Sequence, residues 1–421
     1  MRPLEQVMTL LDRSHSVFHV VKNMKDALIE AGFAELNENS PFELQENGKY
    51  FVTRNGSSII AFKVPANPKK GYRIAATHND SPTFVLKPEP LLNKGAVAQI
   101  NTEPYGGGIY YSWLDRPLSF AGRVFVKEGE SVKCVLVDMD EDCFVIPSLA
   151  IHMNRSVNEN LALNPAKDLV PLWLDRQYEG DFASYLKEAF KLDGEVISYD
   201  LALYVREKAR LVGGAANLLL SPRLDDLASS YSSLLAFVDS EAKEGGHVSV
   251  FASFDNEEVG SLTFQGANSD FLKNTLRRIG KGLGWKEEAR QIAQANSILL
   301  SVDNAHANHP NHPELSDATT NVKLNGGIVL KYNAAQHYTT SGKSAAYVKM
   351  LANALNQPIQ EFTNRSDLRG GSTLGNLSNA EISLISADIG IAQLAMHSCV
   401  ELCGANDIAR MVELLKAHYE N

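Results

Sequence analysis

Cysteine is scarce in this chain, and long apolar runs and basic stretches are missing from it. The 421 residues include four cysteines, and no two of them form a Cys-x-x-Cys pair, which predicts reduced thiols. No apolar stretch reaches the ~18 residues that a membrane-spanning helix needs, and the N-terminus lacks a secretory apolar segment. These absences predict a cytoplasmic protein.

The balance of charge excludes some partners as well. The formal net charge is −10, and the basic residues do not gather into runs. A polyanion or an anionic membrane surface would be repelled by such a chain, so we expect no nucleic acid and no membrane as a partner. What the chain does contain is 44% hydrophobic residues, enough to bury large cores in two or more domains.

Apolar periodicity divides the chain into three stretches. Residues 5–32 carry an apolar stripe at helical spacing, and strands are expected at about 58–64 and 71–77. From about 84 to 220, short runs typical of β-strands dominate. From 225 onward helical patterns and apolar strands alternate again, which indicates an α/β arrangement.

The most informative segment contains two adjacent glutamates, Glu257 and Glu258, directly after the apolar run Val248–Phe254. Two carboxylates at the end of a buried strand are costly unless their charge is used. One of them can bind a cation while the other serves as general base to a water on that cation. A glutamate pair taken alone is more often part of a solvated turn, so the interpretation depends on further ligands.

Four more candidate ligands lie close to apolar segments. His78 and Asp303 each follow a run that is typical of a strand, and His397 comes shortly after a third such run. Asp225 directly precedes a helical pattern. In an open α/β sheet, groups at the carboxyl ends of neighbouring strands meet in one crevice, so these residues predict a single site.

The types of ligand select the class of metal. Two imidazoles and three carboxylates suit Zn²⁺, Co²⁺ or Mn²⁺ better than Ca²⁺ or a thiolate cluster. Five ligands are too many for one tetrahedral ion but fit two divalent ions that share a bridging carboxylate. Asp80 lies two residues after His78, so both side chains point to one face of an extended segment and Asp80 can hold the imidazole.

The order of these ligands predicts an insertion. His78 precedes the β-rich stretch, whereas the other candidate ligands follow it. We therefore expect an α/β catalytic domain formed by residues 1–83 and 222–421, into which a β-rich domain of residues 84–221 is inserted. Within the insert, Gly106-Gly107-Gly108 is not followed by the Gly-Lys-Ser/Thr of a phosphate-binding loop, so it predicts a tight turn beside a site or an interface.

Several short segments carry a more specific signal together than any residue does alone. They are Phe18-His19-Val20-Val21, Thr53-Arg54-Asn55-Gly56-Ser57-Ser58, His78-Asn79-Asp80-Ser81-Pro82, Tyr105-Gly106-Gly107-Gly108-Ile109, Ser221-Pro222-Arg223-Leu224-Asp225, Asp255-Asn256-Glu257-Glu258-Val259-Gly260-Ser261, Asp303-Asn304-Ala305-His306 and Met396-His397-Ser398. In this order, and over nearly the whole chain, they resemble the aspartyl aminopeptidase family of dinuclear zinc exopeptidases. The resemblance implies a mixed-sheet α/β zinc-exopeptidase domain flanked by helices, with an inserted β-rich dimerisation domain.

The resemblance also implies a role for each candidate ligand. Two metal ions per subunit, zinc with cobalt or manganese as alternatives, would share Asp225 as the bridge. Their other ligands would be His78 and Asp303 on one ion, and Glu258 and His397 on the other. Glu257 is left as the general base. A further catalytic residue, His152, would reach the site of a neighbouring subunit and stabilise the oxyanion, within a dimer-based and dodecameric shell.

Substrate recognition is implied at three positions, Lys331, Tyr338 and Gly371. Lys331 matches a family position suited to binding an acidic side chain, and Gly371 belongs to a loop that offers backbone N–H groups to substrate. The chain departs from the family pattern at His337, where acidic-specific members are expected to have arginine, and at Gly327, where a proline is expected. A broader or neutral preference therefore stays open.

These observations predict a metal-dependent aminopeptidase that removes an N-terminal residue, Asp or Glu by preference, from peptides. Glu257 would deprotonate a metal-bridged water and later protonate the leaving amine. The alternatives are an aminopeptidase of broad or neutral specificity, or a deacylase or carboxypeptidase that uses the same dinuclear site. A catalytically inactive assembly protein on the same fold is a further alternative, which the presence of Glu257 and all five ligands disfavours.

Overall fold

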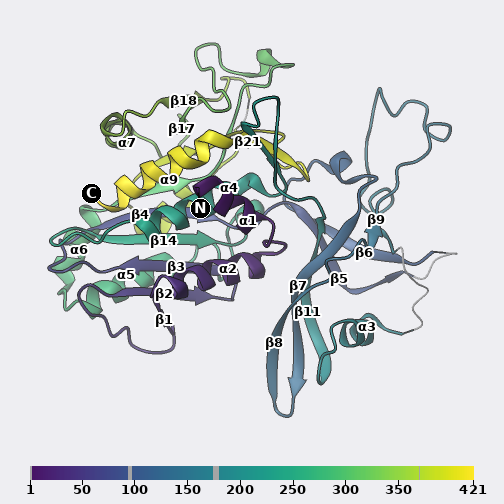
Figure 1. Cartoon of the computed structure of the whole chain (residues 1–421), viewed down its shortest axis with the longest axis horizontal. Coiled ribbons are helices and arrows are strands. Elements are labelled where there is room, and N and C mark those ends of the chain that lie inside the picture. Colours follow the sequence, from purple (N-terminus) through teal and green to yellow (C-terminus); the bar gives the residue numbers. More distant parts are fainter. Residues whose placement is uncertain (1, 93–96, 174–179, 369) are drawn as a thin grey trace.

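The computed structural model describes residues 2–92, 97–173, 180–368 and 370–421. One half of the molecule is a sheet covered by helices on both faces, and the other half is a separate group of long strands (Figure 1). The strands of the second half come from the middle of the sequence, between segments that build the first half.

The larger sheet, sheet A, is mixed, and its four central strands β14, β4, β15 and β19 run parallel to one another. Antiparallel pairing with β3 and β17 extends it on either side. In spatial order its strands are β1 (Ala34–Leu36), β2 (Lys49–Arg54), β3 (Ser58–Lys63), β14 (Val248–Phe254), β4 (Tyr72–His78), β15 (Ile298–Val302), β19 (Ile385–Gly390), β17 (Ile328–Tyr332) and β18 (Ile359–Thr363). Because the central strands are parallel, their carboxyl ends share one edge.

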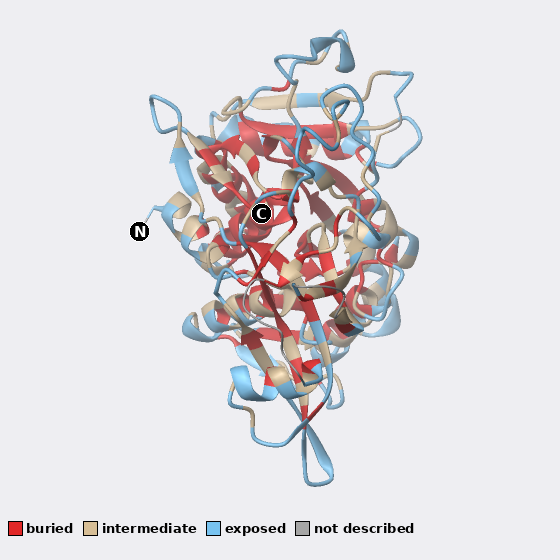
Figure 2. Ribbon diagram, turned by 90° about the vertical axis from the view of Figure 1, so that its right-hand side faces the viewer, coloured by how far each residue is buried: buried red, intermediate tan, exposed pale blue. Residues whose placement is uncertain are grey.

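Sheet A separates two hydrophobic cores. Along β3, Ile59 and Ala61 pack into one core while Ile60 and Phe62 pack into the other, as the two-residue period of a strand requires. β3 and β14 are buried along their whole length, and most of their residues are apolar, as burial on both faces requires (Figure 2). The first core is covered by α1 (Pro3–Leu11), α2 (Val17–Glu30), α4 (Leu224–Asp239), α7 (Gly342–Ala354) and α9 (Ala405–Tyr419), and the second by α5 (Phe271–Gly282), α6 (Glu287–Ala295) and α8 (Leu374–Ile382).

The second half contains sheet B, which closes on itself because β11 pairs with both β5 and β7. In order its strands are β11 (Glu195–Val205), β5 (Thr83–Leu92), β6 (Gln99–Tyr105), β10 (Leu172–Trp173), β9 (Phe144–Val145), β7 (Leu118–Glu128) and β8 (Ser131–Asp138). A third core fills its interior, and α3 (Phe182–Ala189) contributes Phe182 and Leu186 to it. The hairpin of β7 and β8 extends away from sheet A (Figure 1).

A smaller sheet, sheet C, joins segments that are distant in sequence. Its strands are β12 (Arg210–Val212), β13 (Leu218–Ser221), β21 (Glu401–Gly404), β20 (Ala392–Leu394) and β16 (Ala305–His306). Sheet C therefore ties the segment that follows sheet B to the C-terminal part of the chain. Three short 3-10 helices, η1 (Tyr110–Trp113), η2 (Glu257–Val259) and η3 (Pro313–Leu315), occur in the described connections.

The α/β fold class predicted from the sequence is confirmed. Residues 5–32, whose apolar stripe has helical spacing, are mostly helical, but they form two helices, α1 and α2, with a break between them. Ser14 donates its hydroxyl to the carbonyl of Leu10 at 2.6 Å, and Ser16 caps α2 by accepting from the backbone N–H of His19, so the two serines end one helix and begin the next. Among the described residues, none of the helices combines the length and apolar character that crossing a bilayer requires.

Candidate metal centre

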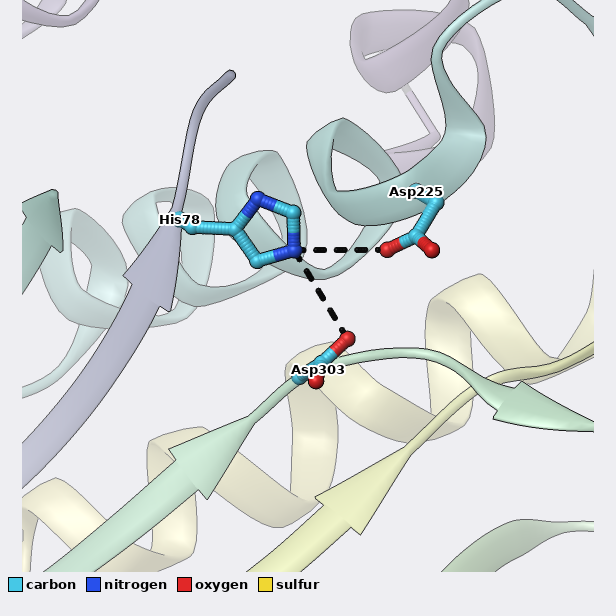
Figure 3. A group of neighbouring side chains, drawn as sticks. All are labelled: His78, Asp225 and Asp303. Carbon is cyan, nitrogen blue, oxygen red and sulfur yellow. Dashed lines mark ion pairs between the residues drawn. The ribbon is translucent and has the colours of Figure 1, made fainter. Parts of the chain in front are cut away.

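The candidate ligands meet at the carboxyl edge of sheet A. His78 is the last residue of β4, Asp303 directly follows β15, and Asp225 lies in the first turn of α4 (Figure 3). In Figure 3 the imidazole of His78 points toward the carboxylates of Asp225 and Asp303. The convergence predicted from the strand ends is thus present in the structure.

The candidate ligands form two groups of three, called the ligand groups below, and both groups contain Asp225. Nε2 of His78 lies 3.4 Å from Oδ1 of Asp225 and 3.7 Å from Oδ1 of Asp303. Nε2 of His397 lies 3.5 Å from Oδ2 of Asp225 and 3.4 Å from Oε2 of Glu258. Asp225 therefore turns one carboxylate oxygen to each group, which is the arrangement of a bridging ligand.

The spacing of these atoms fits zinc. Two ligands at about 2.0–2.1 Å from a tetrahedral ion lie roughly 3.3–3.4 Å apart, close to the separations between the ligand atoms of both groups. Among the described residues, Oδ1 of Asp225 and Oε1 of Glu258 are buried carboxylate oxygens without a hydrogen-bond partner. Buried charge without a partner is destabilising, and a divalent cation between the groups would compensate it.

Both histidines are held so that Nε2 is free to bind a metal. Nδ1 of His78 lies 3.1 Å from the backbone carbonyl of Asp80, and Nδ1 of His397 lies 3.1 Å from the carbonyl of Gly107. A ring that donates from Nδ1 presents the lone pair of Nε2. Asp80 thus contacts His78, as its spacing in the sequence predicts, through its carbonyl and also through Oδ1 at 3.4 Å.

Asp80 also positions the two glutamates. Its carboxylate accepts the backbone N–H groups of Glu257 and Glu258, each at 3.1 Å, and the hydroxyl of Tyr105 at 2.7 Å. These bonds fix η2 against the end of β4. Burial, followed by the negative charges of Asp303, Asp80 and Asp225, raises the pKa of Glu257 to about 8 while His78 opposes the rise.

The glycines at 106–108 form the predicted tight turn beside the site. Gly106 has a φ of +72°, and a Cβ added to it would lie 3.1 Å from Cβ of Glu258. A larger residue here would be strained and would crowd a ligand. Together with the carbonyl of Gly107, the turn supports the group formed by His397 and Glu258.

Glu401 is a residue of this site that the sequence did not reveal. It is buried in β21, and its carboxylate accepts the backbone N–H of Asp225 at 2.9 Å and that of His397 at 2.7 Å. One side chain thereby fixes two ligands that are far apart in sequence. The only signal in the sequence is a lone glutamate in the otherwise apolar run Cys399–Cys403.

Residues 10–419 match the sequence model of a family described as aminopeptidase I zinc metalloprotease (M18). The chain belongs to the M18 family. It is a metal-dependent aminopeptidase, a hydrolase that acts on peptide bonds, and its metal is zinc. The predicted resemblance and the enzyme class are thereby confirmed.

Similar proteins cover almost the whole M18 chain. A Clostridium acetobutylicum protein described as "Probable M18 family aminopeptidase 2" is 42% identical over 406 residues, which are 94% of this chain and 93% of the relative. The structure described as the Ape4 and Nbr1 complex has a TM-score of 0.94 at 34% identity and covers 100% of this chain and 85% of that one. The S. cerevisiae mApe1 dodecamer has a TM-score of 0.86 at 26% identity, with coverage of 99% and 96%.

The remaining candidate residues of this M18 chain lie in three different surroundings. His152 is exposed on the connection that follows β9, and among the described residues no hydrogen bond or ion pair joins it to the candidate ligands of its own chain. Gly371 is exposed in the loop before α8. Tyr338 is buried, with its ring centroid 5.1 Å from Nζ of Lys331.

Lys331 is more firmly engaged than a substrate-facing cation would be. It is 2% exposed, and Nζ donates to the backbone carbonyls of Asp303 at 2.8 Å and Asn304 at 3.1 Å. Nζ also lies 3.5 Å from Oδ2 of Asp303. Lys331 therefore helps to hold the candidate metal ligand Asp303.

Proposed function

We propose that each subunit binds two zinc ions and that Glu257 is the general base of peptide hydrolysis. The observation that carries this proposal is the pair of ligand groups that share Asp225 through its two different carboxylate oxygens. His78 and Asp303 complete one group, and Glu258 and His397 complete the other. When bound, the zinc ions polarise the scissile carbonyl and lower the pKa of water.

Proton transfer in the proposed reaction is carried out by the side chain of Glu257. Glu257 is half-buried on η2, beside Glu258 but outside both ligand groups, so its carboxylate is left to take a proton from the attacking water. The same carboxyl then gives that proton to the leaving amine. The bonds from the backbone N–H groups of Glu257 and Glu258 to Asp80 fix the distance between base and ligands.

The nearest rival activity on this site is hydrolysis of N-acyl amino acids or removal of a C-terminal residue. An aminopeptidase requires a free substrate amine, whereas a deacylase requires a blocked one. We expect zinc-loaded protein to hydrolyse aminoacyl-nitroanilides and to leave the matching N-acetylated compounds and N-acyl amino acids intact. Faster turnover of the blocked compounds would overturn the proposal and favour the rival.

We further propose that the active unit is a homo-oligomer built from dimers, as a dodecamer, in which His152 serves a neighbouring subunit. The solved mApe1 relative is described as a dodecamer. In this chain the connection that carries His152 exposes a run of apolar side chains, with Leu149 58%, Ile151 47% and Met153 75% exposed. An apolar surface of this kind is typical of an interface between subunits.

Mixed oligomers test the role of His152. We expect His152→Ala and Glu257→Gln to be inactive separately, and their random mixture to recover about a quarter of the wild-type rate. Half of the dimers in a random mixture contain one subunit of each variant. In each such dimer, one of the two sites has both Glu257 and the neighbour's His152, so a quarter of all sites are complete. The measurement is hydrolysis by co-expressed, differently tagged subunits that have been purified through both tags and checked for metal content, with each variant alone as the control. No recovery in verified mixed assemblies would remove His152 from the neighbour's site.

We also propose that the enzyme prefers substrates with N-terminal Asp or Glu. Lys331 would be the cation that binds the acidic side chain of the substrate. Its ammonium lies against the ring of Tyr338, and two of its three N–H donors are used by Asp303 and Asn304. A broad or neutral preference is the second candidate, and it is favoured by that engagement and by the exposed His337. Gly327 also differs from the family pattern in geometry, because its φ is +106° and its N–H donates to Asp407 at 3.0 Å, which proline cannot do.

Lys331→Met separates the two specificities. With an acidic pocket, kcat/KM for N-terminal Asp and Glu should fall at least about tenfold more than for Leu or Ala, because only the acidic side chains lose an ionic partner. Lys323→Met, an exposed lysine elsewhere, is the matched control. Equal losses for all four substrates, accompanied by a loss of metal, would restrict Lys331 to holding Asp303.

A further inference from the structure

A cavity lies between α2 and sheet B, beside the metal centre, and it reaches Asp225, the residue that both ligand groups share. It has a volume of about 370 Å³, within the range of small-molecule sites. Asp80 and Asp225 touch it, whereas His78, Glu258, Asp303 and His397 do not. Its walls are mainly apolar and include Val17, Val20, Val85, Ala121, Ala202 and Leu203.

Arg223 provides a positive charge at this cavity. Its Nε is buried and has no hydrogen-bond partner among the described residues, and the structure gives its guanidinium no ion pair within them. The guanidinium faces the ring of Tyr204, whose centroid is 6.0 Å from Cζ of Arg223.

The other charged groups around the cavity are already engaged. Asp225 faces the histidines of the two ligand groups at 3.4 and 3.5 Å, and Asp255 accepts the backbone N–H of Asn256 at 2.7 Å. His15 pairs with Asp138 at 2.6 Å, and Arg123 pairs with Asp200 at 2.6 Å. Asp80 accepts the three hydrogen bonds described above, and Glu401 accepts the two backbone N–H groups of the ligands. Arg223 is therefore the lining cation that is left to bind an anion from outside the chain.

Two of the family-like segments identified in the sequence line this cavity but contribute no ligand to the metal centre. Phe18, from the first of them, and Asn55, from the second, both line it. Arg223 comes from a third, two residues before Asp225. The cavity thus collects side chains whose placement the ligand geometry does not explain.

We propose that this cavity binds a small organic carboxylate, with the carboxylate on the guanidinium of Arg223 and an apolar body against the walls from α2, β5, β7 and β11. A guanidinium presents its N–H donors as a planar fork that matches a carboxylate. The apolar walls favour an organic acid over an inorganic anion, because they gain only from contact with carbon. The proposal does not depend on the catalytic roles assigned above.

The probe is 4-methylpentanoate, a branched acid of this class, with 4-methylpentanamide as the uncharged control. Because carboxylates also bind metals, isothermal titration is done on the zinc-loaded full chain whose metal centre is blocked by an amino-acid hydroxamate. We expect saturable binding of one carboxylate per chain and at least about tenfold weaker binding of the amide.

Two variants from different parts of the cavity make the test specific. Arg223→Gln removes the charge, and Ala202→Phe fills the cavity from β11, at a position outside the metal centre. Each should weaken binding of the carboxylate at least about tenfold. Ala202→Ser should retain most of the affinity, whereas Arg223→Lys should retain only part of it, because it keeps the charge but loses the planar fork. Circular dichroism and zinc content show which variants are folded, and Ala202→Phe decides the outcome if Arg223→Gln is not.

Two results would overturn the proposal. No saturable heat with 4-methylpentanoate in the wild-type protein would mean that the cavity holds only water. Affinity unchanged by Ala202→Phe would place the bound acid elsewhere on the chain. Neither result would affect the proposed roles of Asp225 or Glu257, which are measured by metal content and turnover.

Discussion

Replacement of Glu257 by Gln should lower kcat by at least about 10², the usual scale for a lost general base, while metal content stays at about two ions per chain. Glutamine occupies the same space as glutamate but cannot take a proton from water. Because the backbone N–H of Glu257, and not its carboxylate, holds η2 to Asp80, the substitution leaves that support in place. Single-turnover rates and elemental analysis of the same preparation measure both quantities.

The matched control for this substitution is its neighbour, Glu258→Gln. Oε2 of Glu258 faces Nε2 of His397, so an amide there should weaken one metal and lower activity through lost zinc. Excess zinc should then restore part of the rate for Glu258→Gln and none of it for Glu257→Gln. If Glu257→Gln emptied the site but kept its activity per bound metal, the two glutamates would have the opposite roles.

The second large effect is expected at Asp225. Asp225→Ala should remove nearly all bound zinc and all measurable activity, because one carboxylate serves both ligand groups. Asp303→Ala is the matched control, since Asp303 belongs to one group only, and it should retain about one ion per chain. Zinc content after dialysis against a weak chelator measures the difference.

One outcome would contradict the bridging role of Asp225. Equal zinc retention by Asp225→Ala and Asp303→Ala would show that Asp225 is a ligand of one ion and not a bridge. Thermal unfolding gives a second measurement, because a bound metal stabilises the folded chain by mass action. Added zinc should raise the Tm of the wild-type protein more than that of Asp303→Ala, and should raise that of Asp225→Ala least.

Much of the metal centre could be predicted because its residues lie next to strong local patterns. His78 ends β4 and Asp303 follows β15, two buried parallel strands whose mainly apolar sequences can be recognised. The pairing of Asp80 with His78 followed from a spacing of two residues on extended backbone. The division into a helix-covered mixed sheet and a group of β-strands followed from the change in periodicity near residue 84.

The long-range supports could not be predicted in this way. The carboxylate of Glu401 holds Asp225 across 176 residues of sequence, and the carbonyl of Gly107 holds His397 across 290. The periodicity of the sequence does not predict such contacts, because each depends on where two distant segments lie after packing. The same holds for Lys331, whose charge is visible in the sequence but whose engagement by Asp303 is not.

The proposed role of Glu257 as general base came from the family resemblance. The sequence by itself determined which side chains can bind zinc and which strands carry them to one edge. Those properties belong to residue types and to the two-residue and 3.6-residue periods of the backbone. Only the tertiary structure decided that Asp225 turns a different oxygen to each ligand group, and that Arg223 lines a cavity with its Nε unpartnered among the described residues. Both depend on side-chain orientation within a packed interior, which is fixed by contacts between segments far apart in the chain.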